Sequence, residues 1–410
     1  MFIDVSQNLI NLAKYFPENL YIVGGYVRNK LLKIDNSDVD LCSSVSIEQV
    51  EERLSGTKFS VRVKNAKYGA LLISCNGEKY EYTCFRKDTY KDNGSHNASS
   101  ILFTPRIEED AQRRDFTINS IYYNINKDEV VDLYHGIIDL NDKIIRCNLA
   151  PEEVLRYDGE RILRMIRIAG ELDFSIDKKT MQTAKEYSKN LMEISGTRKF
   201  SEIEKILYCD RRYRLNKGSL KRALKLLNEL KIWKYFNLEK PKIKYDKVYK
   251  VEDRFFGLLI DIVDTQKPEC LEDFLEKLLK EQFGLSQPLA DKIFVYLAGY
   301  YDALSGMKNK EYFFKYFPDW TNISILLSSK SKHIQNKYHF FYLYIIEHGL
   351  CIQVSDLRIN ETDIKKNFPD IDKRSYKKIL HNLLSKVFDG KVLNQKEELL
   401  KEIENKLQNY

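Results

Sequence analysis

The chain of 410 residues is long enough for about two to four domains, and its content of 43% hydrophobic and 31% charged residues excludes a disordered protein. Its seven cysteines are odd in number and irregularly spaced, which argues against a disulfide framework and favours reduced thiols. The formal net charge of +7 is modest, no apolar run approaches the ~20 residues of a membrane helix, and the N-terminus lacks an Arg-rich presequence, so we expect a cytoplasmic protein outside the membrane.

The first predicted elements lead to a glycine turn. Apolar residues near helical spacing predict a short amphipathic helix within Phe2–Phe16, and Tyr21–Val23 predicts a strand. Gly24 and Gly25 follow, and then a helical segment that contains Arg28. Glycines at such a turn let backbone N–H groups approach an anion at a helix N-terminus, so the turn is a candidate phosphate site, although most such pairs are only turns.

An acidic triplet closes this unit. Asp38, Val39 and Asp40 predict a strand in which both carboxylates project from one face, because side chains alternate along a strand. Two adjacent carboxylates repel each other unless a hard cation lies between them, and Mg²⁺ binds few carboxylates together with substrate phosphates. The ordinary alternative is a solvated strand end. Together, the glycine turn and the acidic triplet indicate a site for magnesium and a nucleotide.

A second sheet segment follows. Ile47–Leu54 predicts a charged helix, and Phe59–Val63 and Ala70–Ser74 predict strands. The Asn-Gly pair at 76–77 is a strong hairpin signal, which pairs Ala70–Ser74 with Lys79–Phe85.

The second arm of this hairpin carries a candidate third carboxylate. Glu81 lies on the arm and would complete a three-acid site if the arm joins the sheet of Asp38 and Asp40. A surface glutamate on an edge strand is the plainer interpretation. Glu78 and Asp88 are the alternatives for the third acid.

The next stretch is polar and then strongly charged. Residues 87–110, with Gly94 to Asn97 at their centre, predict a mobile loop. In the segment RRDFTINS that follows, Arg114 can grip phosphate bidentately and Asp115 can accept a ribose hydroxyl at a predicted helix start. Asp132–Arg146 is expected to be structural, with His135 in a loop.

The segment Pro151–Leu172 predicts a helix, since a proline at the first turn is followed by two glutamates. Leucine, isoleucine, methionine and alanine recur at three- and four-residue intervals and form a buried stripe. The opposite face is charged and carries Asp158, Arg161, Arg164 and Arg167. This face is either a solvated, salt-bridged surface or one side of a nucleotide site. In the second case Asp158 and Arg161 would contact the base, and Arg164 and Arg167 would bind phosphates.

The stretch from Arg198 to Lys250 is strongly basic. It contains 17 Lys and Arg residues against 6 Asp and Glu residues, a net of +11 from 17 − 6. Aromatic residues lie among the cations, either as stacking platforms or as the core of a helical bundle. This charge density favours contact with a nucleic-acid backbone.

The motifs GGYVRNKLL, DNSDVDL, RRDFTINS and SGTRKFSEIEKIL resemble those of class II tRNA nucleotidyltransferases, the CCA-adding enzymes, and of their bacterial poly(A) polymerase relatives in the polymerase β-like superfamily. The chain departs from the family pattern at Asn29, where aspartate is usual, at Tyr157 and Thr197, where glutamate is usual, and in its GSHNASS loop. The stretch KNAKYGALLI resembles the tRNA-specific branch rather than the poly(A) polymerases.

The resemblance implies an α+β fold, in which a small mixed sheet with helices is followed by helical domains in an elongated arrangement. The expected domains are a nucleotidyltransferase head at 1–147, a nucleotide-selecting neck at 148–212, a helical body at 213–305 and a helical, tRNA-binding tail at 306–410.

The implied activity is template-independent addition of CCA to the tRNA 3′ end from CTP and ATP, with release of pyrophosphate and a two-metal mechanism using Mg²⁺. The alternatives are addition of only CC or only A, poly(A) synthesis, and a non-catalytic RNA-binding protein. The implied catalytic residues are Asp38, Asp40 and Glu81, with Asp38 and Asp40 as metal ligands. The implied nucleotide-binding residues are Gly24, Gly25, Arg28, Arg114, Asp115, Asp158, Arg161, Arg164 and Arg167.

Overall fold

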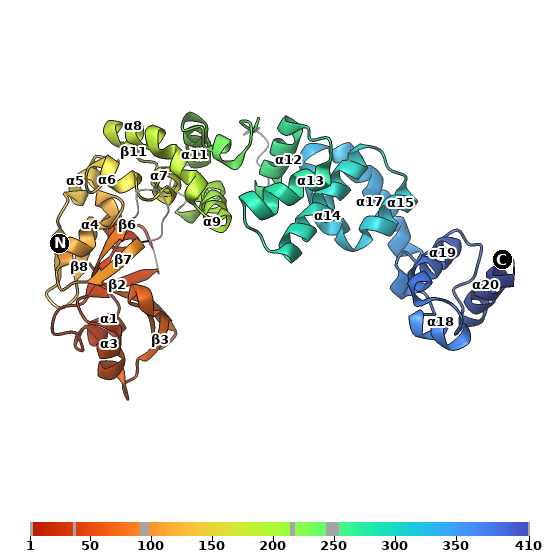
Figure 1. Ribbon diagram of the computed structural model, residues 1–410, viewed down its shortest axis with the longest axis horizontal. Helices are drawn as coiled ribbons and strands as arrows, with labels where there is room; N and C mark the ends of the chain where they lie inside the picture. The colour runs from red at the N-terminus through yellow and green to blue at the C-terminus, as the bar shows by residue number, and fades with distance from the viewer. Residues whose placement is uncertain (1–2, 36–37, 91–97, 214–217, 243–253, 409–410) are drawn as a thin grey trace. The chain divides into compact units, whose positions relative to one another are not determined.

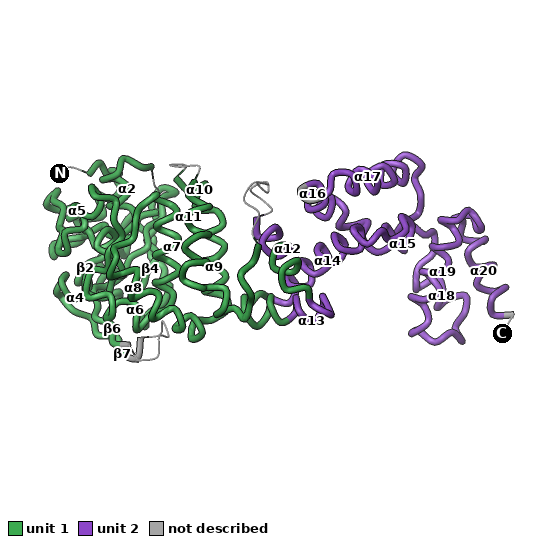
Figure 2. Tube along the Cα trace, turned by 90° about the horizontal axis from the view of Figure 1, so that it is seen from above, with its two compact units in different colours: residues 1–245, 261–267, 277–285 green, residues 246–260, 268–276, 286–410 purple. Residues whose placement is uncertain are grey.

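The computed structural model describes residues 3–35, 38–90, 98–213, 218–242 and 254–408. The chain divides into two compact units (Figure 2). Unit 1 contains residues 1–245, 261–267 and 277–285, and unit 2 contains residues 246–260, 268–276 and 286–410. Over the described residues, no helix combines the length and the apolar character needed to cross a membrane. None of the seven cysteines forms a disulfide.

A mixed sheet of seven strands forms the centre of the N-terminal part of unit 1 (Figure 1). Its strand order is β3-β4-β5-β2-β1-β8-β9, with β2 and β5 parallel and the other neighbours antiparallel. The strands are β1 Tyr21–Val23, β2 Val39–Ser43, β3 Ser60–Asn65, β4 Ala70–Cys75, β5 Glu78–Cys84, β8 Ile121–Asn124 and β9 Glu129–Asp132.

The hairpin predicted at 76–77 joins β4 to β5, and its pairing is confirmed. Alternate residues of these strands are buried, among them Leu71, Ile73, Tyr80 and Tyr82, because one face of each strand packs into the core. Three helices accompany the first strands, as the hydrophobic spacing predicted: α1 Gln7–Ala13, α2 Gly25–Leu31 and α3 Ile47–Leu54.

The prediction of a loop at residues 87–110 is wrong for most of this segment. Strand β6 Arg86–Tyr90 pairs with β7 Ala98–Phe103 in a separate two-stranded sheet, and helix α4 Ile107–Gln112 follows. The centre of the expected loop, Gly94 to Asn97, lies outside the described residues. A small sheet of this kind has little apolar patterning to reveal it, and two of its apolar side chains, Leu102 and Phe103, are exposed.

The helix start predicted at Asp115 is only a single 3₁₀ turn, η2, at Thr117–Asn119. Beyond β8 and β9, helix α5 Gly136–Asn141 and strand β10 Ile144–Ile145 complete this part of unit 1. His135 precedes α5 in the left-handed conformation, with φ 57°, outside any helix or strand, as predicted.

The helix predicted over Pro151–Leu172 is two helices, α6 Pro151–Leu155 and α7 Glu160–Leu172. The predicted buried stripe is confirmed, since Leu155, Ile162, Met165, Ile166 and Ala169 are all buried. The rest of unit 1 contains β11 Ser175–Ile176, which pairs with β10, and further helices. These are α8 Lys178–Tyr187, η3 Ser188–Glu193, α9 Gly196–Leu207, α10 Cys209–Arg212, α11 Ser219–Glu229 and η4 Ile232–Phe236.

The remaining described elements are helical. They are α12 Arg254–Gln266, α13 Leu271–Glu276, a π-helical turn at Lys277–Gln282, α14 Gln287–Leu304, α15 Asn309–Tyr316, α16 Trp320–Lys330, α17 Lys332–Glu347, α18 Glu361–Asn367, α19 Tyr376–Phe388 and α20 Lys396–Gln408, with 3₁₀ turns at Phe317–Asp319, Val354–Asp356 and Lys373–Ser375. Unit 2 has an aromatic core around Tyr312, Phe313, Trp320 and Tyr338. A separate cluster from Leu357 to Ile403 packs the last three helices.

The α+β class is therefore confirmed, with a sheet-containing N-terminal part followed by helices. The division into head, neck, body and tail stays a prediction.

Candidate active site

A cleft of about 800 Å³ lies in unit 1. It brings together all twelve residues that the sequence singled out, although they come from segments up to about 140 positions apart. The cleft is lined by Gly24, Gly25, Arg28, Asp38, Asp40, Glu81, Arg114, Asp115, Asp158, Arg161, Arg164 and Arg167, among others. Their chemical roles stay predictions.

Three carboxylates lie on the sheet side of the cleft. Asp40 is on β2, Asp38 directly precedes that strand, and Glu81 is the partner of Asp40 across the parallel β2 and β5 pair. Asp40 is exposed, but the protein atoms around it displace part of its hydration and raise its pKa; Arg114 opposes this increase, while Glu81 and Asp38 add to it. The ionised Asp40 carboxylate therefore lacks full compensation.

Cations of the protein contact the other two acids. Lys64 forms an ion pair with Glu81, and Arg212 Nη2 donates to Asp38 Oδ2 at 3.0 Å. Within the described residues, no group of three His, Cys, Asp or Glu side chains is arranged to hold a metal ion. An open set of carboxylates nevertheless fits Mg²⁺, which keeps several waters and binds through one or two carboxylates plus phosphates. The observation that favours a cation here is the placement of Asp38, Asp40 and Glu81 on neighbouring strands at one cleft.

The two alternatives for the third acid are less suitable. Glu78 accepts hydrogen bonds from Ser6 and Tyr80 and does not line the cleft. The Asp88 side chain lines the cleft but is only 3% exposed, and it accepts from Arg86 Nε at 2.9 Å. Glu81 remains the third acid that we favour.

The glycine turn adjoins these acids. Gly24 has φ +79°, a backbone conformation that favours glycine, and α2 begins directly after it. A Cβ atom at Gly24 would lie 3.7 Å from Asp40 Oδ2, so the turn and the acid face each other.

Arg28 projects from α2 into the cleft and is buried. Its Nη1 donates to Asn119 Oδ1 at 2.6 Å, and its Nε and Nη2 donate to Asn29 Oδ1 at 3.0 Å each. Its Nη2 also donates to the Tyr213 hydroxyl at 3.3 Å. Burial lowers the pKa of Arg28, and Tyr213 opposes this decrease.

The substitution Asn29→Asp is expected to stabilise the protein by about 1–2 kcal/mol, because hydrogen bonds to charged groups are worth more than neutral ones. The Nδ2 atom of the fully buried Asn29 has no hydrogen-bond partner, whereas a carboxylate would remove this donor and pair with Arg28. Thermal unfolding of the two proteins at neutral pH measures the effect. An unchanged or lower melting temperature would show that the buried Arg28 is already fully compensated.

Arg113 and Arg114 are held by an acid that the sequence reasoning missed. Asp110 is completely buried, and its two carboxylate oxygens accept from Arg113 Nε at 2.9 Å and from Arg114 Nη2 at 2.9 Å. The Tyr122 hydroxyl donates to the same carboxylate at 2.8 Å. Burial alone would raise the pKa of Asp110, but the two arginines and Tyr122 outweigh it and hold the pKa well below its usual value.

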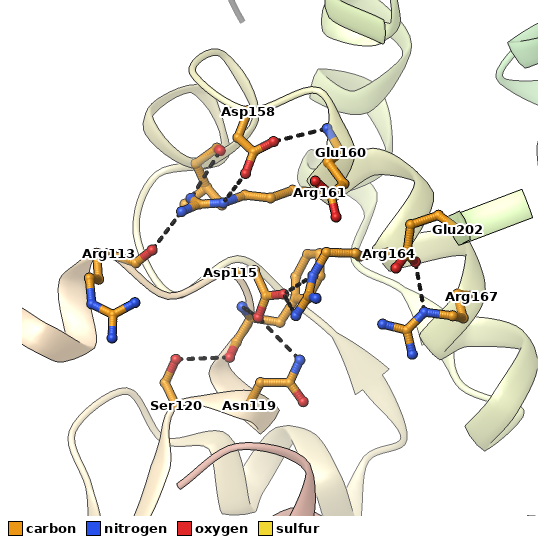
Figure 3. A network of polar contacts seen from close by, with 12 residues as sticks. Arg113, Asp115, Asn119, Ser120, Asp158, Glu160, Arg161, Arg164, Arg167 and Glu202 are labelled. Carbon is orange, nitrogen blue, oxygen red and sulfur yellow. Dashed lines mark hydrogen bonds and ion pairs between the residues drawn. The ribbon is translucent and has the colours of Figure 1, made fainter. Parts of the chain in front are cut away.

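Asp115 connects the sheet-containing part of unit 1 to α7 (Figure 3). Arg164 donates to Asp115 Oδ2 through Nε at 2.9 Å, and Asn119 Nδ2 donates to Oδ1 at 3.1 Å. Burial opposes ionisation of Asp115, but Arg164, Arg161 and Asn119 together hold its pKa well below its usual value. Asp115 is therefore ionised at neutral pH and orients Arg164 in the cleft.

The predicted base-reading pair lies at the start of α7, where Figure 3 shows Arg161 extending between Asp158 and the backbone of Arg113. Arg161 donates to the carbonyl oxygens of Arg113 at 2.5 Å and Val154 at 3.2 Å, and its Nε lies 3.5 Å from Asp158 Oδ2. Asp158 Oδ1 accepts from the backbone N–H of Glu160 at 3.0 Å. These contacts hold both side chains in place.

Gly159, next to Asp158, directly precedes α7 and lies against η3. A Cβ atom at this position would lie 2.7 Å from the backbone carbon and oxygen of Asn190 in η3, so no side chain fits. The substitution Gly159→Ala is expected to displace Asp158 and Arg161 and to lower kcat/KM for nucleotide addition about tenfold or more, since small displacements of positioning groups are costly. Steady-state kinetics with each nucleotide, beside a thermal melt, measure the effect; unchanged kinetics would show that η3 moves aside without cost.

Helix α9, which carries the motif SGTRKFSEIEKIL, contacts α7 through two ion pairs. Arg167 Nε donates to Glu202 Oε2 at 2.7 Å, and Arg198 Nη1 donates to Glu160 Oε2 at 2.8 Å. Arg167 also contacts Glu171, so this arginine is held by two buried acids at the edge of the cleft.

Further cleft residues carried no signal in the sequence analysis. Asn119 lay inside a quoted motif without a role, and Arg212 and Tyr213 were counted only as part of the basic stretch. The spacing between Arg28 and its partner Tyr213, 185 residues, leaves no local pattern to detect.

Two family models match the chain. Residues 20–146 match the poly A polymerase head domain, and residues 173–244 match the probable RNA- and SrmB-binding site of polymerase A. The CCA-adding enzyme of Streptococcus thermophilus is 38% identical over 188 residues, which are 46% of this chain and 45% of that protein; the CCA-adding enzyme of Streptococcus mutans is 37% identical over the same shares. The match thus spans less than half the length of these relatives.

The solved structures extend the likeness in fold to nearly the whole chain. The Bacillus stearothermophilus CCA-adding enzyme in complex with CTP superposes with a TM-score of 0.69 at 21% identity, covering 98% of this chain and 99% of that one. The Thermotoga maritima CCA-adding enzyme complexed with tRNA superposes with a TM-score of 0.58 at 20% identity, covering 98% and 96%.

Proposed function

Because two poly A polymerase family models match segments of the chain and a CCA-adding enzyme matches 46% of it, we propose that it is a class II tRNA nucleotidyltransferase that adds CCA to the 3′ end of tRNA without a nucleic-acid template. CTP and ATP are the substrates, and pyrophosphate is released. The observation that carries this proposal is that three groups of residues line one cleft. These groups are the acids Asp38, Asp40 and Glu81, the arginines of α2, α7 and residue 114, and the Asp158 and Arg161 pair.

Asp38 and Asp40 would hold Mg²⁺, with Glu81 as the third acid of the site. Two Mg²⁺ ions, when bound, supply the charge that activates the RNA 3′-hydroxyl and neutralises the triphosphate. The protein positions the triphosphate with the turn at Gly24 and Gly25 and with cationic side chains. These are Arg28, Arg114, Arg164 and Arg167, all of which line the cleft.

Asp115 would accept the ribose hydroxyl, and Asp158 and Arg161 would choose the base. A carboxylate accepts from the exocyclic amino group that cytosine and adenine share, and a guanidinium donates to the ring acceptor beside it. The contacts that hold Arg161 orient its guanidinium before a nucleotide arrives. Pre-organised groups of this kind lose little free energy when the correct base binds.

The RNA would lie along the basic stretch from Arg198 to Lys250, largely within the matched RNA-binding segment. In this proposal the head, neck, body and tail have the boundaries predicted above, and the tail also contacts tRNA. We place the reaction in the cytoplasm, and cysteines without disulfides fit a reducing compartment.

The experiment is incubation of the protein with tRNA that ends at the discriminator base, in CTP alone, in ATP alone and in both, with MgCl₂ throughout. A CCA-adding enzyme gives CC with CTP alone and CCA with both nucleotides, which mass spectrometry of the products resolves. The Asp40→Asn variant in parallel shows that the protein itself carries the activity.

The other products separate the rival functions. A long tail from ATP alone would indicate a poly(A) polymerase, and incorporation of one nucleotide type with no CCA product would indicate a partial enzyme. tRNA binding without incorporation of any nucleotide would identify a non-catalytic RNA-binding protein and overturn the proposal.

A further inference from the structure

An arginine of the RNA-binding segment reaches the acids of the head. Arg212 is the last residue of α10, and its Nη2 donates to Asp38 Oδ2 at 3.0 Å. Its Nε donates to the Tyr213 hydroxyl at 3.1 Å, and that hydroxyl also accepts from Arg28 Nη2. Arg212 thus links the carboxylate of Asp38 to the segment of residues 173–244 that matches an RNA-binding model.

The ion pair between Arg212 and Asp38 is weak enough for either side chain to change partner. The Asp38 side chain is 73% exposed and the Arg212 side chain is 43% exposed, and ion pairs between exposed groups are weak. A divalent cation at Asp38 would compete with the guanidinium, because both cations seek the same carboxylate and repel each other.

The Arg212 side chain also adjoins a second site, apart from Asp38. It lines a second pocket of about 360 Å³, together with Lys205, Tyr208, Arg211 and the acids Glu171 and Glu204. Besides Arg212, this pocket has two cations, two acids and an aromatic ring, so an RNA phosphate there would be bound by Lys205 and Arg211 rather than by a uniformly basic surface. Arg212 therefore lies between Asp38 and a second pocket that contains further cations.

We propose that Arg212 is a positioning residue that changes partner. It contacts Asp38 when no divalent cation is bound, and it contacts a phosphate near the RNA 3′ end once the cation occupies Asp38. The guanidinium fork suits both partners, since it pairs with carboxylates and phosphates alike. This inference rests on the proposed function, because it takes RNA and a divalent cation as ligands of this site.

The exchange couples the two ligands. A cation that releases Arg212 strengthens RNA binding, and RNA that captures Arg212 strengthens cation binding by the same factor. The coupling is expected to be about two- to fivefold, the range that one exposed ion pair supports.

The first measurement is Mn²⁺ binding to the RNA-free protein, followed by the paramagnetic resonance signal of free Mn²⁺. The Arg212→Gln variant is expected to bind the cation about two- to fivefold more tightly than the unmodified protein. The matched control is Arg211→Gln, which removes a cation from the neighbouring position and from the same second pocket but not from Asp38. Its Mn²⁺ affinity is expected to be unchanged.

The second measurement is the affinity for tRNA ending at the discriminator base, by fluorescence anisotropy with and without Mg²⁺ at constant ionic strength and without nucleotides. The gain from Mg²⁺ is expected to be two- to fivefold smaller in Arg212→Gln than in the unmodified protein or in Arg211→Gln. Effects of Mg²⁺ on the RNA alone cancel, because all proteins bind the same RNA. Arg212→Lys, which keeps the charge, is expected to retain part of the coupling.

Equal Mn²⁺ affinity and equal Mg²⁺ gain in all variants would overturn the proposal. If the unmodified protein also adds CCA, such a result would leave the proposed function standing and remove only the exchange. If the unmodified protein binds neither Mn²⁺ nor tRNA, both proposals fail.

Discussion

Asp40→Asn is expected to reduce nucleotide addition by about a thousandfold or more, while the protein remains folded. The carboxylate that would hold Mg²⁺ is lost, and about 4 kcal/mol of transition-state stabilisation corresponds to this factor. The pKa of Asp40 is raised in the folded protein, so its ionisation at neutral pH works against folding. The melting temperature without metal is therefore expected to be equal or higher in the variant.

Single-turnover nucleotide addition and a thermal melt in EDTA measure the two effects. Asp4→Asn is a suitable control, because Asp4 is an exposed acid of the same unit that does not line the cleft. Activity within tenfold of the unmodified enzyme would remove Asp40 from the metal site. A large fall in melting temperature would instead assign Asp40 a structural role.

Asp110→Asn is expected to destabilise unit 1 by about 3–5 kcal/mol, because it leaves two guanidinium groups without their shared buried carboxylate. The pKa of Asp110 lies below its unfolded value, so its contribution to stability is present at neutral pH and is lost as the pH falls towards the folded value. The variant is expected to show the largest loss near neutral pH and a smaller difference in acid.

Hydrogen exchange in peptides that cover residues 107–124, together with urea denaturation, measures this loss where it occurs. The matched control is Glu108→Gln, an exposed acid of the same helix, for which a change within about 0.5 kcal/mol is expected. A loss below 1 kcal/mol for Asp110→Asn would mean that Arg113 and Arg114 find other partners or water.

Local patterns in the sequence predicted the parts of the site that are local in space. The glycine turn, the Asp38 and Asp40 pair and the hairpin that carries Glu81 follow from strand alternation and turn chemistry, and their placement together in the cleft agrees with the structure. The charged face beyond Asp158 followed from helical spacing in the same way.

What the sequence could not reveal depends on contacts between distant segments. Asp110 is one acid among several in EEDAQRR, and only the packing of Tyr122 from β8 decides that it is the buried one. The break between α6 and α7 lies just before Glu160, where the backbone of η3 leaves no room for a side chain at residue 159. The short β6 and β7 pair is too polar to stand out from a loop.

The contact between Asp115 and Arg164 has a consequence for engineering and for evolution. Strand β10 pairs with β11, and the Asp115 carboxylate depends on an arginine 49 positions further along the chain. A fragment that stops at residue 147 would keep a buried negative charge and lose its counterion, so it is a poor candidate for expression alone. A chimera that changes the charge at residue 115 or at residue 164 alone would leave the other side chain without this partner, so changes at the two positions are expected to be coupled.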